Sequence, residues 1–253
     1  MTKGAKVALA SVAALILAVG IEVTYIKHKR AVEANEPTAS TQPQYGASRK
    51  LTADDDVYLR KLRPDSLKDA RSLIGKTVWV SAGDQLDYYV DTGNHVDYSK
   101  PAGVLKGAEP LEIKAVFEEK APDSGRAVQR ISAGERHVLF AFTMPKGENP
   151  KQLYAVATGH YEGGIYEFIN DEVFFYDDPH TLYKHWSADA WAHVDKHECA
   201  VGMSENQCML ALGQTIDPHG DTMGDRSVTY QNGGHPVTAD FVNGKAVKVS
   251  KDS

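Results

Sequence analysis

The chain has 253 residues, of which 42% are hydrophobic and 25% are charged, a composition that excludes wholesale disorder and suits one large domain or two small ones. Its 34 acidic and 28 basic side chains give a formal net charge of −6, so no excess of basic residues is available to hold a nucleic acid backbone. Two cysteines are too few for a four-thiolate metal site or a disulfide-framework fold. We therefore expect a folded protein that binds no nucleic acid.

Residues 1–30 are predicted to direct the chain to a membrane, because two lysines precede an uncharged apolar run from residue 7 to 21. Continued to Ile26, this run is just long enough to cross about 30 Å of hydrocarbon. A basic collar at residues 27–30 favours an uncleaved anchor. The alternative is cleavage after Gly20, which would release the rest of the chain. We expect a bacterial inner-membrane anchor with a periplasmic C-terminal portion, or secretion to the periplasm after cleavage.

The remaining chain divides into a linker and two modules, and the predicted class is α+β. Residues 31–51 are rich in Ala, Thr, Ser, Gln and Pro and nearly lack large aliphatic side chains, which is typical of a flexible tether. Residues 52–177 are predicted to hold short helices and a barrel-like β module, and residues 178–253 an α+β module.

In the β module, Thr52 is expected to cap a short helix over residues 54–63, and a second helix over 64–73 to stop before Gly75. Strands are then predicted at 76–81, 86–90, 110–117, 136–144 and 153–158, with short apolar runs in 166–176. Alternation in the third of these strands places Leu111, Ile113, Ala115 and Phe117 on one face. The succession indicates a small antiparallel barrel of the SH3-like or OB-like kind.

The C-terminal module has stronger local signals. Asp178 before Pro179 is typical of a helix start. Ser204 and Gln207 form a predicted capping box for a helix that runs through Leu212 and stops at Gly213. After a polar loop, strands at 227–230, 237–242 and 246–249 are separated by Asn-Gly turns, which predicts two helices packed on a three-stranded meander.

This order resembles the SmpA/BamE-type domain of bacterial envelope lipoproteins. The resemblance spans about Ala188 to Val249 and rests on a Gly202-Met203-Ser204 helix start followed by Gln207, a Leu212-Gly213 helix end, and a last hairpin with the sequence DFVNGK at residues 240–245. It implies an α+β layer that binds other envelope proteins and has no catalytic centre.

Cys199 and Cys208 bracket the capping box. In an oxidising periplasm they could pair, which would stabilise the fold by about 2–3 kcal/mol; the alternative is two small buried thiols that never meet. His193 and His197 share one helix face if the helix continues that far, so a weak metal site with Cys199 is a second hypothesis. Solvated or packing histidines are the simpler interpretation.

The aromatic side chains near the module boundary admit two interpretations. Tyr183, Trp186 and Trp191 could form a shared core with residues 174–176, or they could anchor a protein partner. The stretch ARSLIGKT at 70–77 lacks the first glycine of a phosphate-binding loop, so no nucleotide is expected. No catalytic residue and no cofactor is predicted.

These patterns favour a membrane-tethered envelope protein with a non-catalytic role in protein binding, assembly or scaffolding. Envelope proteins are the expected partners. One alternative is a peptidoglycan-binding protein that uses the SH3-like barrel. A second is a metal-dependent envelope enzyme that uses the region His180–His197.

Overall fold

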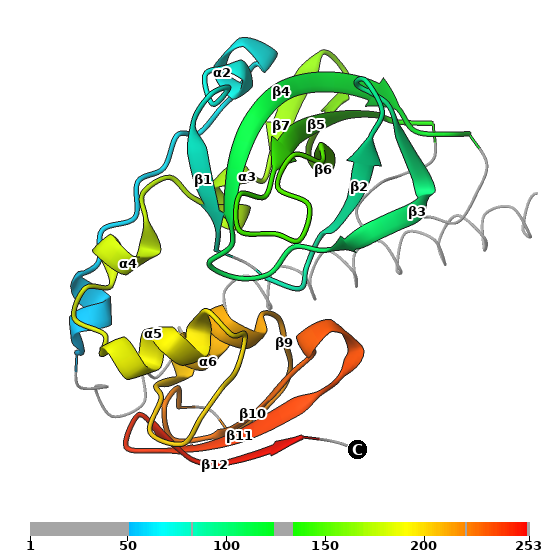
Figure 1. Ribbon diagram of the computed structural model, residues 1–253. Coiled ribbons are helices and arrows are strands. Elements are labelled where there is room, and N and C mark those ends of the chain that lie inside the picture. The colour runs from blue at the N-terminus through cyan, green and yellow to red at the C-terminus, as the bar shows by residue number, and fades with distance from the viewer. Residues whose placement is uncertain (1–50, 82, 124–133, 221, 252–253) are drawn as a thin grey trace, which may run out of the picture. The chain divides into compact units, whose positions relative to one another are not determined.

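The computed structural model describes residues 51–81, 83–123, 134–220 and 222–251, which belong to one compact unit, Lys50–Ser253. They form a mixed α+β structure dominated by two antiparallel sheets, so the predicted class is confirmed (Figure 1). The predicted membrane segment 1–30 and all of the predicted linker except Leu51 lie outside these residues. Within them, no helix is both long and apolar enough to cross a membrane.

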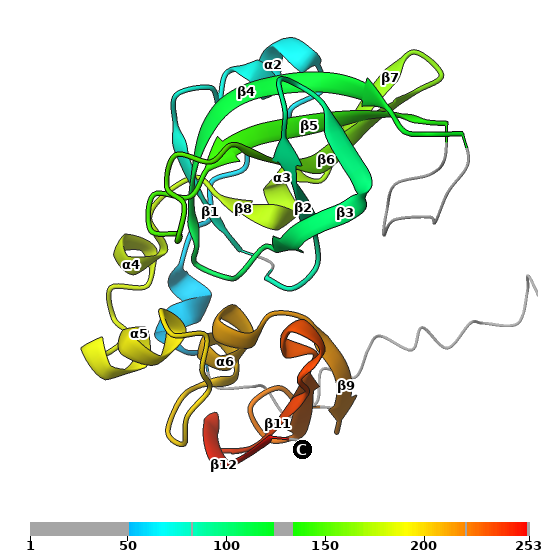
Figure 2. The ribbon, with the colours of Figure 1, turned by 45° about the vertical axis from the view of Figure 1, so that its right-hand side comes forward.

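The larger sheet is antiparallel and strongly curved (Figures 1 and 2). Within the described residues its eight strands follow the order β3-β2-β6-β5-β4-β1-β8, with β7 beside β6. The strands are β1 (Thr77–Val80), β2 (Asp87–Asp91), β3 (Val96–Val104), β4 (Pro110–Lys120), β5 (Arg136–Thr143), β6 (Tyr154–Glu162), β7 (Ile165–Phe168) and β8 (Phe174–Phe175). The five strands predicted before residue 160 are confirmed, whereas β3 was not anticipated.

Strand β3 escaped prediction because its sequence, VDYSKPAGV, lacks a run of β-forming residues and contains a proline. It lies at the end of the sheet order and pairs with β2. There the missing N–H of Pro101 interrupts no inner ladder of the sheet. Tertiary pairing therefore overrides a weak local preference.

The prediction that Leu111, Ile113, Ala115 and Phe117 share a face is wrong. The register of β4 against β5 shifts between Ile113 and Ala115, which is a β-bulge. Because the bulge inserts one residue, Leu111 and Ile113 pack in one core, whereas Ala115 and Phe117 pack in another on the opposite side.

The helix predicted over 54–63 is also wrong. Only a 3₁₀ turn forms there, η1 (Ala53–Asp56), and the chain then runs extended to a short helix, α2 (Leu67–Arg71), which Ser66 caps. We call residues 52–65 the strap. The backbone N–H groups of Leu62 and Arg63 donate to the Asp171 carboxylate, both at 2.9 Å, instead of to helical carbonyls. A long-range partner therefore replaces the local helix.

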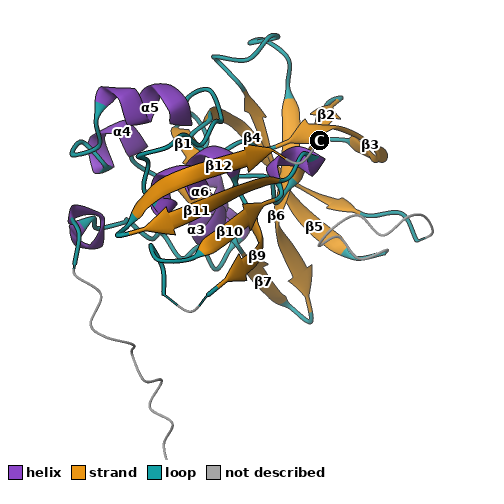
Figure 3. Cartoon of the chain, turned by 90° about the horizontal axis from the view of Figure 1, so that it is seen from below, coloured by secondary structure: helices purple, strands orange, loops and turns teal. Residues whose placement is uncertain are grey.

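The smaller sheet contains β9 (Thr215–His219), β10 (Ser227–Tyr230), β11 (Val237–Val242) and β12 (Lys245–Lys251), in the order β12-β11-β10-β9. Figure 3 shows these strands side by side, with α6 (Glu205–Leu212) behind them. The predicted meander is present, but β9 extends it where a polar loop was expected. Two further short helices, α4 (Pro179–Leu182) and α5 (Ala188–Val194), precede α6, and α5 packs against α6.

Glycines let the two sheets' modules meet backbone to backbone. A Cβ on Gly107, in the loop before β4, would lie 1.9 Å from the carbonyl oxygen of Leu210 in α6. A Cβ on Gly213, which ends α6 at φ +81°, would lie 2.5 Å from the Gly83 carbonyl oxygen. Phe175 of β8 joins the same hydrophobic core as α5 and α6, so the C-terminal module packs directly on the larger sheet's loops and last strand.

Candidate functional site

The predicted aromatic anchors lie mostly inside the protein. Trp186 and Trp191 are each 8% exposed, and their ring centroids lie 5.0 Å apart. Tyr183 is half-buried and stacks on Trp186 at 4.5 Å. Phe175 belongs to the same core, whereas Phe174 and Tyr176 pack in the core of the larger sheet. The structure therefore brings the three anchors together as packing residues, with one edge of the cluster facing the strap.

At that edge, the carboxylate of Asp54 meets a set of side-chain donors from the C-terminal module. His185 Nε2 lies 2.5 Å from Asp54 Oδ1, and Trp186 donates its indole N–H to the same oxygen at 2.7 Å. Asn206, in the first turn of α6, donates its amide to Oδ2 at 2.8 Å. We call these four residues the Asp54 clamp. Only 11% of the Asp54 side chain is exposed.

The charge state of Asp54 follows from these contacts. Burial by itself would raise the pKa of the Asp54 carboxyl, but the hydrogen bonds from His185, Asn206 and Trp186 outweigh burial and lower it below its ordinary value. The clamp therefore holds an ionised carboxylate at neutral pH. Side chains with N–H donors that converge on one carboxylate are the chemistry of anion recognition.

A second carboxylate holds the other end of the strap. Besides the two backbone N–H groups of the strap, Asp171 accepts the hydroxyl of Tyr176 at 2.8 Å. Burial raises the pKa of Asp171, and these hydrogen bonds lower it further than burial raises it. Between the two anchors, Leu59 packs on the core of the C-terminal module and the Arg60 guanidinium donates to the Tyr176 carbonyl. The strap thus bridges both modules.

His180 is held near the clamp by two carboxylates. Its Nδ1 lies 3.0 Å from Asp178 and its Nε2 3.3 Å from Asp195. Its ring stacks on Trp191 with centroids 4.0 Å apart. Because both ring nitrogens face carboxylates, His180 stabilises the turn between α4 and α5 and presents no free nitrogen to a metal.

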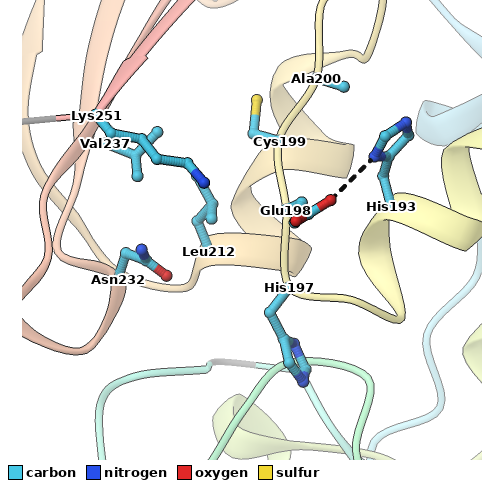
Figure 4. Close-up of a pocket in the computed structure, with 9 residues that line it drawn as sticks. All are labelled: His193, His197, Glu198, Cys199, Ala200, Leu212, Asn232, Val237 and Lys251. Carbon is cyan, nitrogen blue, oxygen red and sulfur yellow. Dashed lines mark ion pairs between the residues drawn. The ribbon is translucent and has the colours of Figure 1, made fainter.

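The predicted metal ligands line a separate cavity of about 210 Å³ (Figure 4). There His193 Nδ1 lies 3.6 Å from Glu198 Oε2. The ring of His197 points away from His193, and burial, followed by the nearby charge of Lys106, lowers the pKa of its imidazole. In the described chain, no group of three or more His, Cys, Asp or Glu side chains is close enough to hold a metal ion.

Cys199 and Cys208 form a disulfide, with Cα atoms 4.8 Å apart. Cys199 lines the cavity of Figure 4, whereas Cys208 is fully buried in α6. A disulfide sulfur carries no thiolate, so Cys199 cannot act as a metal ligand in this state. The bridge instead fixes the loop after α5 to the helix that supplies Asn206 to the clamp.

Sequence reasoning missed the clamp. The local pattern places Asp54 at the start of a predicted helix over residues 54–63, and His185 lies within the region His180–His197 without a signal of its own. Asp54 is separated from its donors by 131 to 152 positions. No local pattern connects residues so far apart.

Comparison with known proteins identifies no relative: no family model, no curated protein and no solved structure matches this chain.

Proposed function

We propose that this chain is a membrane-tethered protein of a bacterial envelope whose folded part lies in the periplasm and binds another envelope protein without catalysing a reaction. The disulfide between Cys199 and Cys208 is the observation that carries the proposal. Structural disulfides persist in oxidising compartments and are rare in the reducing cytosol. The charged and apolar pattern of residues 1–30 supports the same compartment.

The experiment measures the redox state of the cysteines in growing cells. Thiols are trapped by acid quenching, and the full-length chain is then treated with a polyethylene-glycol maleimide before and after reduction. We expect no label without reductant and two labels with it. Two labels without reductant would overturn the periplasmic assignment. Activity of a reporter enzyme that works only in the cytosol, fused to the C-terminus, would overturn the periplasmic assignment independently.

The finer fold assignments also stay proposals. We infer that α5, α6 and β10–β12 form a SmpA/BamE-like layer, supported by the position of the capping box at Ser204 and Gln207 and of the helix end at Gly213. Strand β9 is an addition to that pattern. We infer an SH3-like or OB-like relationship for the larger sheet from its curvature and its consecutive antiparallel hairpins β4–β5–β6.

A binding role fits the way the folded part treats its own strap. The Asp54 clamp already binds a carboxylate of the 3₁₀ turn η1 through side-chain donors, a mode that a protein partner could use as well. Crosslinking in cells, followed by mass spectrometry, should recover envelope proteins joined to the C-terminal module. Recovery of cytosolic proteins alone would contradict the proposed role.

A further inference from the structure

The surface that the strap covers, which we call the groove, makes the kinds of contact that a peptide-binding site makes. At one end, the clamp binds the Asp54 carboxylate. The His185 imidazole, the Trp186 indole N–H and the Asn206 amide lie 2.5, 2.7 and 2.8 Å from its oxygens. Five residues further along the strap, Leu59 packs among the side chains of the C-terminal core. At the far end, Asp171 accepts backbone N–H groups. These three kinds of contact recognise an acidic side chain, an aliphatic side chain and an extended backbone, in that order.

The strap occupies this groove without being part of the surrounding architecture. From Val57 to Asp65, the described backbone forms neither helix nor strand. It contributes no strand to either sheet, and side chains hold its two ends. A segment held in this way can leave without breaking a β-ladder.

The strap also fills its groove incompletely. A cavity of about 120 Å³ remains between the strap and the body, lined by Leu59, Arg60, Ser81, Phe174, Tyr176 and Leu182. The lining combines apolar residues, among them Leu59, Phe174 and Leu182, with the charged residues Arg60, Lys61, Asp171, Glu172 and Asp177. A segment with a larger apolar side chain at the Leu59 position could fill this space and gain the contacts that the strap lacks.

We propose that the groove formed by His185, Trp186, Asn206, Leu182 and Asp171 binds an acidic–aliphatic segment of a partner protein, and that the strap is its internal occupant. The partner segment carries an Asp, an aliphatic or aromatic side chain five residues later, and then free backbone N–H groups that reach the Asp171 carboxylate. This inference rests on the proposed function and names the site and the partner chemistry for it. The charge complementarity is specific, because the clamp offers N–H groups to a carboxylate and the far end offers a carboxylate to N–H groups.

Competition between the strap and the partner determines how the groove responds. A tethered occupant competes at an effective concentration of about 1 mM, so a free peptide with the strap's own affinity binds the intact chain weakly. A single hydrogen bond to a charged group changes an equilibrium constant by about 10- to 100-fold. Removing the charge of Asp54 therefore weakens the internal occupant by about 10- to 100-fold and opens the groove to a peptide.

The experiment titrates a fluorescent peptide of residues 51–64 against the full-length chain in detergent and measures its anisotropy. We expect Asp54→Asn in the chain to tighten peptide binding at least 10-fold over the unaltered chain. Asp56→Asn is the matched control, because Asp56 lies in the same turn but is exposed, and should bind the peptide as the unaltered chain does. A peptide that carries Asn in place of Asp54 should bind the Asp54→Asn chain at least 10-fold more weakly than the unaltered peptide.

Several results would overturn the proposal. One is equal peptide affinity for the Asp54→Asn and unaltered chains, and another is equal affinity of the Asp and Asn peptides. Should Asp54→Asn not fold, amide exchange on the unaltered chain replaces it: excess peptide should accelerate exchange at Leu62 and Arg63, and unchanged exchange refutes strap displacement. If two copies of the chain exchange their straps in a dimer, the peptide would instead dissociate this dimer. That result would also refute a separate partner. If the cysteines prove to be reduced in cells but the peptide binds as expected, only the periplasmic assignment is refuted and the binding site stands.

Discussion

Reduction of the Cys199–Cys208 disulfide tests how much this cross-link stabilises the fold. The two cysteines are nine positions apart, and the bond closes a short loop that contains the capping box of α6. The same loop is tied to β12, because the Gly202 N–H donates to the Ala246 carbonyl at 2.8 Å. The cross-link therefore limits the unfolded chain at a place where helix, loop and sheet meet.

Its expected magnitude follows from the loop length. Closing a loop of nine residues removes chain entropy worth about 2.5 kcal/mol at 25 °C. For a folded part of about 200 residues, a change of this size lowers Tm by about 5–10 °C and the urea midpoint by about 1 M. Reduction breaks the S–S bond and adds one hydrogen to each sulfur without removing a heavy atom, so this loss is not confounded by a new cavity.

The assay is urea and thermal unfolding of the full-length chain with and without dithiothreitol, followed by tryptophan fluorescence. The double variant Cys199→Ala/Cys208→Ala is the control, because dithiothreitol should leave its unfolding unchanged. Identical midpoints for the oxidised and reduced chain would refute the reasoning. A shift that also occurs in the double variant would show that the reductant acts elsewhere.

Three further perturbations have definite expected outcomes. Gly107→Ala should cost about 3 kcal/mol in the free energy of unfolding, because its Cβ would overlap the Leu210 carbonyl oxygen; chemical denaturation measures this, and a cost below about 1 kcal/mol would contradict the close approach. Arg226→Ala should cost about 3–5 kcal/mol, because Glu205 is 6% exposed and would lose the guanidinium at 2.6 Å. The double variant Arg226→Ala/Glu205→Gln should cost less than Arg226→Ala alone, because the introduced glutamine carries no charge. An equal or larger cost would exclude a buried unpaired charge as the cause. The strap should lose amide protection in acid, as hydrogen exchange would show. The pKa of Asp54 is lowered in the folded state, so its contribution is complete above the ordinary carboxyl pKa and disappears as the pH falls through the folded value. Strap protection that stays at its neutral-pH level until the whole chain unfolds in acid would refute this linkage.

The capping box at Ser204 and Gln207 shows what local sequence predicts well. The Ser204 hydroxyl accepts a hydrogen bond from the Gln207 backbone N–H, and Gln207 Oε1 accepts one from the Ser204 backbone N–H at 2.7 Å. Both are expected from residues three positions apart. The helix start at Asp178 and the helix end at Gly213 are of the same kind. Each signal involves groups within a few positions of one another, so no tertiary partner is needed to complete it.

The larger sheet shows where local patterns fail. The alternation in residues 110–117 is real, but the bulge after Ile113 moves Phe117 to the other face, and only pairing with β5 shows the bulge. The strap has an acidic start and apolar spacing that suit a helix, yet Asp171 takes its backbone N–H groups. In both cases a distant partner offers hydrogen bonds that the isolated segment does not have.

Local signals were sufficient to predict the α+β class, most strand positions and the start and end of α6, because periodicity and capping act over a few residues. Long-range packing, in contrast, turns Trp186 inward, adds β9 and β3 to their sheets, and brings Asp54 to donors more than 130 positions away. The physical reason is the range of the interactions: a carboxylate finds its N–H donors through the packing of whole modules, and such packing leaves no periodic trace along the chain.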